Sequence, residues 1–300
     1  MRVLAVVGPT ASGKSRLALQ VATERIAAGR PTELVAVDAF TIYSGMDIGT
    51  AKPEPSERGA VPHHLIDLIE PETELSVAAF RDLARSAIAE IHGRGATPLL
   101  VGGSGLYFRA VVDPLRFPPT DARLRARLEA RWADDPHQAH AHLAQLDPAA
   151  ATRIDPANLR RTVRALEVVE LTGQPFSAFD DSYERYESIY PDLEVVLLDP
   201  PTELLRASIE ERARQMVRRG LVDETAALRA RGPLSRTAAQ AIGYAEAAAV
   251  LDGALPPDEL AVVIARRTWR YARRQRSWFR ADPRCRRLTF SEAHQQLVDA

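Results

Sequence analysis

The 300-residue chain is poor in cysteine, because Cys285 is its only one. A single thiol excludes an intrachain disulfide and a zinc site built from several cysteines. The sequence also lacks a run of the roughly 18 apolar residues that can cross a bilayer. Its first residues, MRVLAVVGPT, reach a glycine-rich motif at Gly8 and leave no space for a secretory leader. We therefore expect a cytoplasmic protein with no membrane segment.

The chain also has no excess of positive or negative charge. The chain has 39 basic and 40 acidic residues and a net charge of −1, so its overall charge identifies no partner. Lysine is scarce, since Lys14 and Lys52 are the only two and all other basic residues are arginine. Both lysines lie in N-terminal motifs, and lysine and arginine are not interchangeable at a phosphate site. This placement gives mild support to phosphate chemistry near the N-terminus.

Alternation of strands and helices predicts an α/β fold. Continuous apolar runs, typical of buried parallel strands, occupy residues 2–7, 34–37, 97–103 and 192–199. Helical periodicity covers residues 14–28, 76–92, 202–219, 221–231, 237–252 and 257–280. After Pro114 the pattern changes to short helices with many breaks, up to about residue 187. We predict a core with a parallel sheet flanked by helices (1–120 and 188–300) and a helical insertion domain (121–187).

The most specific local motif is GPTASGKS at residues 8–15, which matches the P-loop pattern G-x-x-x-x-G-K-[S/T]. Its members are Gly8, Pro9, Thr10, Ala11, Ser12, Gly13, Lys14 and Ser15. The backbone N–H groups of such a loop and the helix that follows it cradle phosphate oxygens. Lys14 would neutralise charge and the Ser15 hydroxyl would hold Mg²⁺. The motif therefore predicts a diphosphate site with Mg²⁺ as cofactor.

Two further polar residues follow predicted strands. Asp38 comes at the carboxyl end of strand 34–37, where side chains point into the ligand crevice of a parallel sheet. It could organise a metal, act as a general base, or cap a turn. Ser104 lies in the glycine-rich turn VGGSGLY (101–107) and could donate to a phosphate or cap a helix.

Three other features carry weaker signals. The loop MDIGTAKP (46–53) could close over phosphates or a substrate. The adjacent histidines His63 and His64 would face opposite sides of a strand, so they are poor joint metal ligands. Arginines interleaved with aromatics at 266–287, together with Arg160, Arg161 and Arg164, suit RNA phosphates and base stacking, although a basic solvated helix is the alternative.

These motifs in this order resemble tRNA dimethylallyltransferases, which prenylate N6 of adenosine 37 beside the anticodon. The matching segments are GPTASGKS, VDAFTIYSGMDIGTAKP, PHHLIDLIEPETELSVAAF, LVGGSGLY, DPAAATRIDPANLRRTVRALEVVELTGQP, RARQMVRRGLVDE, AQAIGYAEA and RTWRYARRQRSWF. The resemblance implies a P-loop kinase-like core whose helical insert grips the anticodon stem-loop. It also implies that the P-loop holds dimethylallyl diphosphate, although a P-loop alone would suggest nucleotide or ATP binding.

The resemblance implies roles for individual residues. Asp38 would be the general base, while Ser104 and Arg212 would join Lys14 and Ser15 with Mg²⁺ in neutralising the diphosphate. The residues implied to bind tRNA are Asp38, Ala39, Phe40, Thr41, Ser104, Arg160, Arg161, Arg164, Arg273 and Arg274. The sequence contains no coiled-coil pattern, so we expect a monomer.

The chain departs from the family pattern at three positions. Thr41 replaces a glutamine expected near the target nucleotide, Asn158 replaces an aspartate, and Trp269 replaces an arginine. All three belong to the side implied to face RNA. Three alternatives therefore stay open: prenyl transfer to a free adenine nucleotide or other small acceptor, a P-loop nucleotide kinase, and a non-catalytic RNA-binding relative.

Overall fold

The computed structural model describes residues 1–59, 61–179 and 185–300, which form two compact units. One unit contains Met1–Asp113 and Ser188–Ala300, and the other contains Pro114–Glu187. From the sequence we expected the first boundary after residue 120, whereas the smaller unit begins at Pro114. The guanidinium of Arg164 donates to the carbonyls of Pro118 (2.8 Å) and Pro119 (2.9 Å), which attaches this segment to the insert.

A six-stranded parallel sheet forms the centre of the larger unit. Its strands, in the order β3-β2-β4-β1-β5-β6, are β1 (Arg2–Val7), β2 (Thr32–Ala36), β3 (His63–His64), β4 (Thr97–Gly102), β5 (Asp192–Leu198) and β6 (Cys285–Leu288). The four apolar runs predicted as strands are β1, β2, β4 and β5. The edge strand β6 was not predicted, because its sequence CRRL has no apolar run.

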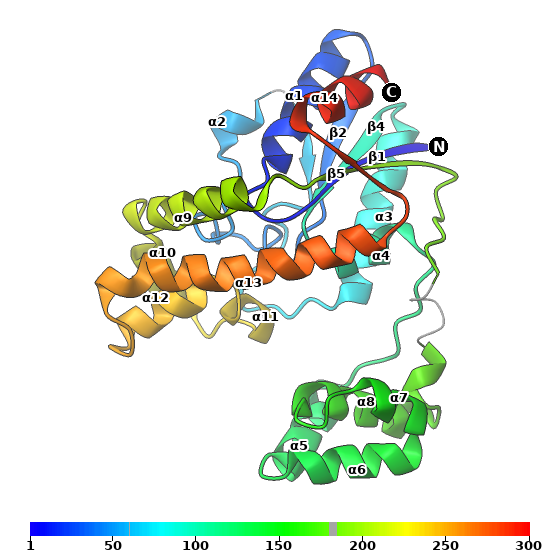
Figure 1. The fold of residues 1–300 in the computed structure, drawn as a ribbon, viewed down its shortest axis with the longest axis vertical. Coiled ribbons are helices and arrows are strands. Elements are labelled where there is room, and N and C mark those ends of the chain that lie inside the picture. The colour runs from blue at the N-terminus through cyan, green and yellow to red at the C-terminus, as the bar shows by residue number, and fades with distance from the viewer. Residues whose placement is uncertain (60, 180–184) are drawn as a thin grey trace. The chain divides into compact units, whose positions relative to one another are not determined.

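The two faces of this sheet are both covered, which explains the continuous apolar strands. Alternate residues of β1 point into separate cores, Val3 and Val7 on one face and Leu4 and Val6 on the other. Helices α1 (Lys14–Ala27) and α14 (Phe290–Asp299) lie side by side over one face (Figure 1). Helices α3 (Val77–Gly93) and α4 (Gly105–Val112) pack on the other.

Further helices complete the larger unit. They are α2 (Pro55–Arg58), α9 (Thr202–Arg218), α10 (Leu221–Arg231), α11 (Arg236–Ala239), α12 (Tyr244–Leu251) and α13 (Leu260–Ala281), with a 3₁₀ turn at Pro257–Glu259. The prediction of one helix over 237–252 was wrong, because Gly243 adopts φ 102° and separates α11 from α12. Helices α9 and α13 run alongside each other (Figure 1).

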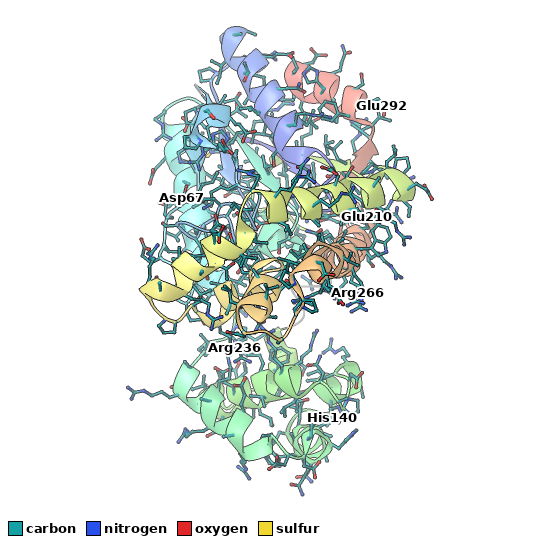
Figure 2. The ribbon with its side chains drawn as sticks, turned by 90° about the vertical axis from the view of Figure 1, so that its left-hand side faces the viewer. Asp67, His140, Glu210, Arg236, Arg266 and Glu292 are labelled. Atoms are coloured by element: carbon teal, nitrogen blue, oxygen red, sulfur yellow. The ribbon has the colours of Figure 1, made fainter. Side chains whose placement is uncertain are left out.

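The insert has its own apolar core. Its helices are α5 (Ala122–Trp132), α6 (Pro136–Leu146), α7 (Pro148–Arg153) and α8 (Leu159–Thr172), followed by a 3₁₀ turn at Phe176–Phe179. Leu128, Leu143 and Leu166 are buried among them. The imidazole of His140, labelled in Figure 2, lies 3.0 Å from the carbonyls of both Ala151 and Ile154.

We predicted a helical insert over 121–187; the described unit spans Pro114–Glu187 and its helices are α5 to α8. Residues 180–184 lie outside the described part. The α/β class, with a parallel sheet flanked by helices, is confirmed. Among the described residues, no helix is both long and apolar enough to cross a bilayer.

Candidate active site

The loop between β1 and α1 has the backbone of an anion cradle. Gly8 (φ 146°) and Gly13 (φ 91°) adopt conformations that favour glycine. A Cβ added to Gly8 would lie 2.3 Å from the carbonyl oxygen of Leu198, so a larger residue does not fit there. Gly13 precedes α1 and no side chain caps the helix, which leaves its N-terminal N–H groups available for phosphate.

Lys14 and the serines complete this loop. The Lys14 ammonium donates to the carbonyl of Pro9 at 2.7 Å. Desolvation, followed by repulsion from Arg212, lowers the pKa of Lys14 to about 7, although Asp38 opposes the shift. The Ser12 hydroxyl is buried without a hydrogen-bond partner in the structure, and Ser15 is exposed at the start of α1. These features suit the loop to bind an anion.

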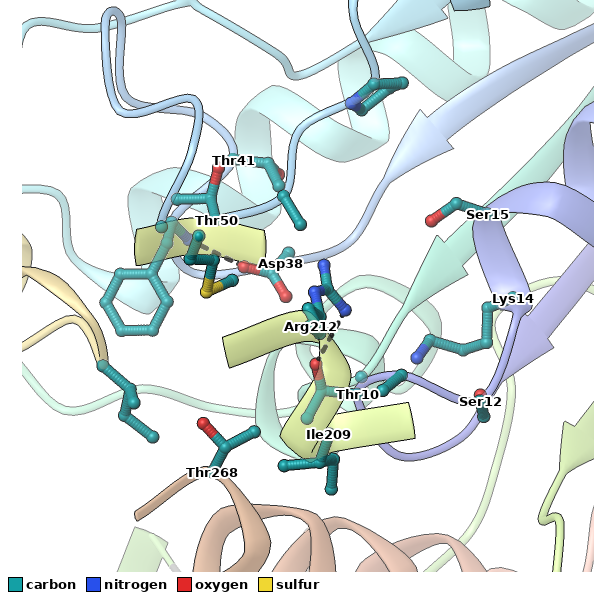
Figure 3. Close-up of a pocket in the computed structure, with 18 of the residues that line it drawn as sticks. Thr10, Ser12, Lys14, Ser15, Asp38, Thr41, Thr50, Ile209, Arg212 and Thr268 are labelled. Atoms are coloured by element: carbon teal, nitrogen blue, oxygen red, sulfur yellow. Dashed lines mark hydrogen bonds between the residues drawn. The ribbon is translucent and has the colours of Figure 1, made fainter. Parts of the chain in front are cut away.

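A cavity of about 790 Å³ opens above this loop, entirely within the larger unit. Thr10, Lys14, Ser15, Asp38 and Arg212 all line it (Figure 3). The structure therefore brings together the P-loop and two of the three predicted catalytic residues, Asp38 and Arg212, without Ser104. These residues come from α1, from the loop after β2, and from α9, so the cavity is assembled from distant segments of the chain.

Asp38 has one of the roles weighed from sequence, that of a turn cap. Its Oδ1 accepts from the backbone N–H of Phe40 at 2.9 Å, so it caps the turn after β2. Asp38 also lines the cavity, on the same side as Arg212 (Figure 3). Arg212 donates to the Thr10 hydroxyl at 3.2 Å, and burial lowers the pKa of its guanidinium while Asp38 opposes that shift.

The loop 46–53 is held by contacts that the sequence did not predict. The buried ammonium of Lys52 donates to the carbonyl of Tyr43 (2.8 Å) and to carboxylates of Asp47 (2.7 Å) and Asp67 (2.5 Å). Lys52 therefore organises the loop through protein contacts. Thr50, Ala51 and Pro53 from this loop line the cavity, as Ile48 and Gly49 do.

A second set of contacts ties the same loop to α10 and α12. The Tyr244 hydroxyl donates to Glu224 at 2.5 Å and accepts from the N–H of Gly49 at 3.2 Å. Glu224 also accepts from the N–H of Ile48 at 3.1 Å. A Cβ on Gly49 would lie 2.3 Å from the Tyr244 ring, so this glycine is needed for close approach. The sequence AQAIGYAEA contains Tyr244 but gives no sign that Tyr244 contacts Gly49, so this contact could not be predicted before the fold was known.

Predicted residues near Asp38 have different environments. Phe40 and Thr41 line the cavity, and the Thr41 hydroxyl is buried with no hydrogen-bond partner in the structure. Ala39 is partly buried against the core. Ser104 caps α4, accepting from the N–H of Tyr107 at 3.5 Å, and is not among the described residues that line the cavity, although Gly102 and Gly103 are. Of the two roles weighed for Ser104, phosphate donor and helix cap, the structure shows the helix cap.

The arginines of α13 divide into two groups. Arg273 and Arg274 are exposed, and the Arg274 guanidinium lies 5.9 Å from the centre of the Tyr271 ring. Arg276 and Arg280 instead bind the buried carboxylate of Asp199, at 2.6 Å each. The basic stretch is therefore part solvent-facing surface and part structural ion pairs.

On the insert, α8 carries the second basic cluster. Arg160 and Arg161 are exposed, whereas Arg164 binds Glu167 at 2.7 Å and the prolyl carbonyls at the start of the insert. Asn158 caps α8 by accepting from the N–H of Arg161 at 3.1 Å, so the amide supplies a cap without a charge.

A family model and individual sequence relatives indicate the same family. The model of the IPP transferase family matches residues 41–282. A tRNA dimethylallyltransferase from Kineococcus radiotolerans is 51% identical over 286 residues, which cover 94% of this chain and 89% of the relative. One from Thermobifida fusca is 47% identical over 299 residues, which cover 99% of this chain and 92% of the relative.

Solved structures agree with the sequence relatives. The chain is similar to the full-length tRNA isopentenylpyrophosphate transferase from Bacillus halodurans, with a TM-score of 0.70, 36% identity, and coverage of 99% of this chain and 94% of that one. A eukaryotic dimethylallyltransferase acting on tRNA gives a TM-score of 0.79 at 24% identity, covering 96% of this chain and 74% of that one. The second likeness supports the fold alone, and the P-loop kinase-like core predicted from sequence is confirmed.

Proposed function

The chain belongs to the IPP transferase family, and on that premise we propose that it is a tRNA dimethylallyltransferase. It transfers a dimethylallyl group from dimethylallyl diphosphate to N6 of adenosine 37 in tRNA and releases diphosphate. The observation that carries this proposal is the single cavity lined by the P-loop, Asp38 and Arg212. Such a cavity brings the cationic anion site and a carboxylate base into one reaction space.

The reaction requires a base because the exocyclic amine of adenine is a weak nucleophile. The N6 lone pair forms a bond to C1 of the dimethylallyl group, and the C1–O bond breaks with its electron pair leaving on the diphosphate. Asp38 accepts the N6 proton. A carboxylate suits this role since it lines the cavity and keeps its turn conformation through the N–H of Phe40.

The leaving group requires positive charge. Lys14 and Arg212 supply it from the P-loop and from α9, and the unpartnered Ser12 hydroxyl and the N–H groups before α1 supply hydrogen bonds. These donors stabilise charge that grows as the C1–O bond breaks. Closing the cavity over the allyl group keeps water from competing with the amine.

The donor set also fits Mg²⁺. Mg²⁺ is usually held by few protein ligands together with substrate phosphates. Ser15 and Asp38 line the same cavity, while no cluster of three or more His, Cys, Asp or Glu side chains able to hold a metal occurs among the described residues. Ser15 would hold the ion, which would neutralise charge on the departing diphosphate.

The acceptor is proposed to be the anticodon stem-loop. A flipped base costs only a few kcal/mol in a single-stranded loop. Exposed arginines on α13 (Arg273, Arg274) and on the insert (Arg160, Arg161) supply contacts to phosphates. A tRNA acceptor fits a cytoplasmic enzyme, and a monomeric state stays a prediction.

One experiment tests donor and acceptor together. Purified protein with Mg²⁺ receives dimethylallyl diphosphate or ATP as donor, and AMP or an anticodon stem-loop RNA as acceptor, with products read by mass spectrometry. We expect prenylated adenosine only from dimethylallyl diphosphate and RNA. Prenylated AMP without prenylated RNA, or phosphoryl transfer from ATP, would refute the proposal in favour of a small acceptor or a kinase.

The Asp38→Asn variant tests the assigned base. It removes the proton acceptor but keeps an oxygen for the N–H of Phe40, so turnover should fall at least about a hundredfold. Binding of the stem-loop, measured by fluorescence anisotropy, should stay within about twofold. Turnover equal to the unsubstituted protein would remove Asp38 from this role.

A further inference from the structure

We propose that Gln275 is a positioning residue for the diphosphate site, which rests on the proposed function of the P-loop. Its carboxamide joins the P-loop to the glycine-rich turn after β4. The residue lies on α13 and is only 4% exposed. Neither the P-loop pattern nor the basic stretch 266–287 singles it out.

Both polar atoms of the carboxamide are engaged with backbone. Gln275 Oε1 accepts from the N–H of Thr10 at 2.8 Å, and Nε2 donates to the carbonyl of Gly103 at 2.7 Å. A carboxamide has an acceptor oxygen and a donor nitrogen, so it can accept at one end of the bridge and donate at the other. Reversing the amide would place donor against donor and acceptor against acceptor, so the two contacts also fix its orientation.

The glycine at the other end of this bridge is fitted to the amide. A Cβ on Gly103 would lie 2.5 Å from Gln275 Nε2, and one on Gly102 would lie 2.0 Å from the carbonyl oxygen of Val37. Val37 immediately precedes Asp38. The bridge therefore runs from the P-loop through Gln275 to the backbone that carries the proposed base.

Helix α13 is itself anchored beside this bridge. The neighbouring Arg276 donates to Asp199 at 2.6 Å and to the carbonyl of Pro200 at 3.0 Å. Both acceptors follow β5, whose last residue, Leu198, closely approaches Gly8. Gln275 is thus presented to the P-loop from a helix that is fixed to the same edge of the sheet.

The consequence concerns the anion site. Because Gln275 occupies the Thr10 N–H, that donor does not turn toward phosphate, and the loop keeps one conformation before the substrate arrives. Gln275 lines the cavity, but its polar atoms are already used by the protein. It therefore acts through the P-loop backbone, and its loss should weaken diphosphate binding more than RNA binding.

The test measures binding of inorganic diphosphate with Mg²⁺ by calorimetry, which does not depend on prenyl transfer. Gln275→Met keeps the length but loses both hydrogen bonds, and Gln275→Glu loses the donor and adds negative charge. We expect diphosphate Kd to rise about tenfold for Met and further for Glu. The Kd for a stem-loop RNA should change less than about twofold.

The matched control is Gln295→Met, the same chemical change on the exposed surface of α14. It should leave both dissociation constants unchanged. A diphosphate Kd for Gln275→Met equal to that of the control would overturn the proposal, as would an equal loss of RNA binding.

A second measurement covers the case in which Gln275→Met does not fold. Gly103→Ala is compared alone and together with Gln275→Ala, since the added methyl group would lie 2.5 Å from the amide nitrogen and 3.2 Å from the carbonyl oxygen of Gly8, and only the first contact is lost with the amide. Gly103→Ala should weaken diphosphate binding about tenfold by itself and less than about threefold in the Gln275→Ala background. Independent, additive losses would refute the coupling.

Discussion

Replacing Lys14 by methionine should change how diphosphate binding depends on pH. Burial and the nearby Arg212 lower the pKa of the Lys14 ammonium from 10.5 to about 7 in the free protein. An anion favours the charged form, so the bound protein carries the ammonium. Above about pH 7, therefore, binding must first take up a proton at Lys14, and affinity should fall as the pH rises.

The size of this pH dependence follows from the fraction of Lys14 that carries the ammonium charge. With a pKa of about 7, roughly nine-tenths of the free protein carries the ammonium near pH 6 and roughly one-tenth near pH 8. The contribution of Lys14 to the binding constant should thus fall about tenfold between these values. An exposed lysine with its ordinary pKa of 10.5 would give no change in this range.

Calorimetry with inorganic diphosphate at constant free Mg²⁺ measures this quantity. Diphosphate titrates in the same range, so the informative value is the affinity ratio between the unsubstituted protein and Lys14→Met, in which the ligand's own titration cancels. That ratio should fall about tenfold from pH 6 to pH 8. A ratio independent of pH would show that Lys14 keeps its proton throughout and would refute the reasoning.

Two substitutions in the loop 46–53 give further predictions, both measured by urea unfolding and by kcat/KM. Lys52→Met leaves the buried carbonyl of Tyr43 without its donor and removes one donor from the partly exposed carboxylates of Asp47 and Asp67, so it should lower the free energy of unfolding by about 1–3 kcal/mol; an unchanged value would contradict the role assigned to Lys52. Gly49→Ala puts a methyl group against the Tyr244 ring and should lower the free energy of unfolding by about 1–3 kcal/mol. It should also lower kcat/KM. Gly93→Ala, where nothing lies within 4 Å of the added carbon, is the control, and equal effects of the two alanines would refute the packing argument.

Short sequence patterns predicted much of this fold, because the strands and the P-loop depend on residues that are close together in the sequence. The apolar runs of β1, β2, β4 and β5 are long enough to need burial on both faces, and the spacing of the P-loop motif is set by the short loop, residues 8–13, between β1 and α1. Asp38 could be placed in the cavity because the carboxyl ends of parallel strands share one edge of a sheet.

Contacts between distant segments could not be predicted from these patterns. Gln275 reaches Thr10 across 265 positions of the chain, and Tyr244 reaches Gly49 across 195. Lys52 was expected at a phosphate loop because of its type, whereas its ammonium is bound by carboxylates that only the folded chain brings to it. From the sequence we predicted one helix where the structure has α11 and α12, because the alanine-rich sequence keeps helical periodicity through Gly243.

The junction between the core and the insert has a consequence for how such a protein can diversify. The N–H of Ile189 donates to the carbonyl of Val112 at 2.8 Å, and Arg85 and Arg284 both bind Asp113, the last residue before the insert. The chain thus leaves and rejoins the core at neighbouring points that the core itself holds closed. An insert whose two ends are held together in this way can be lengthened, trimmed or exchanged without disturbing the sheet.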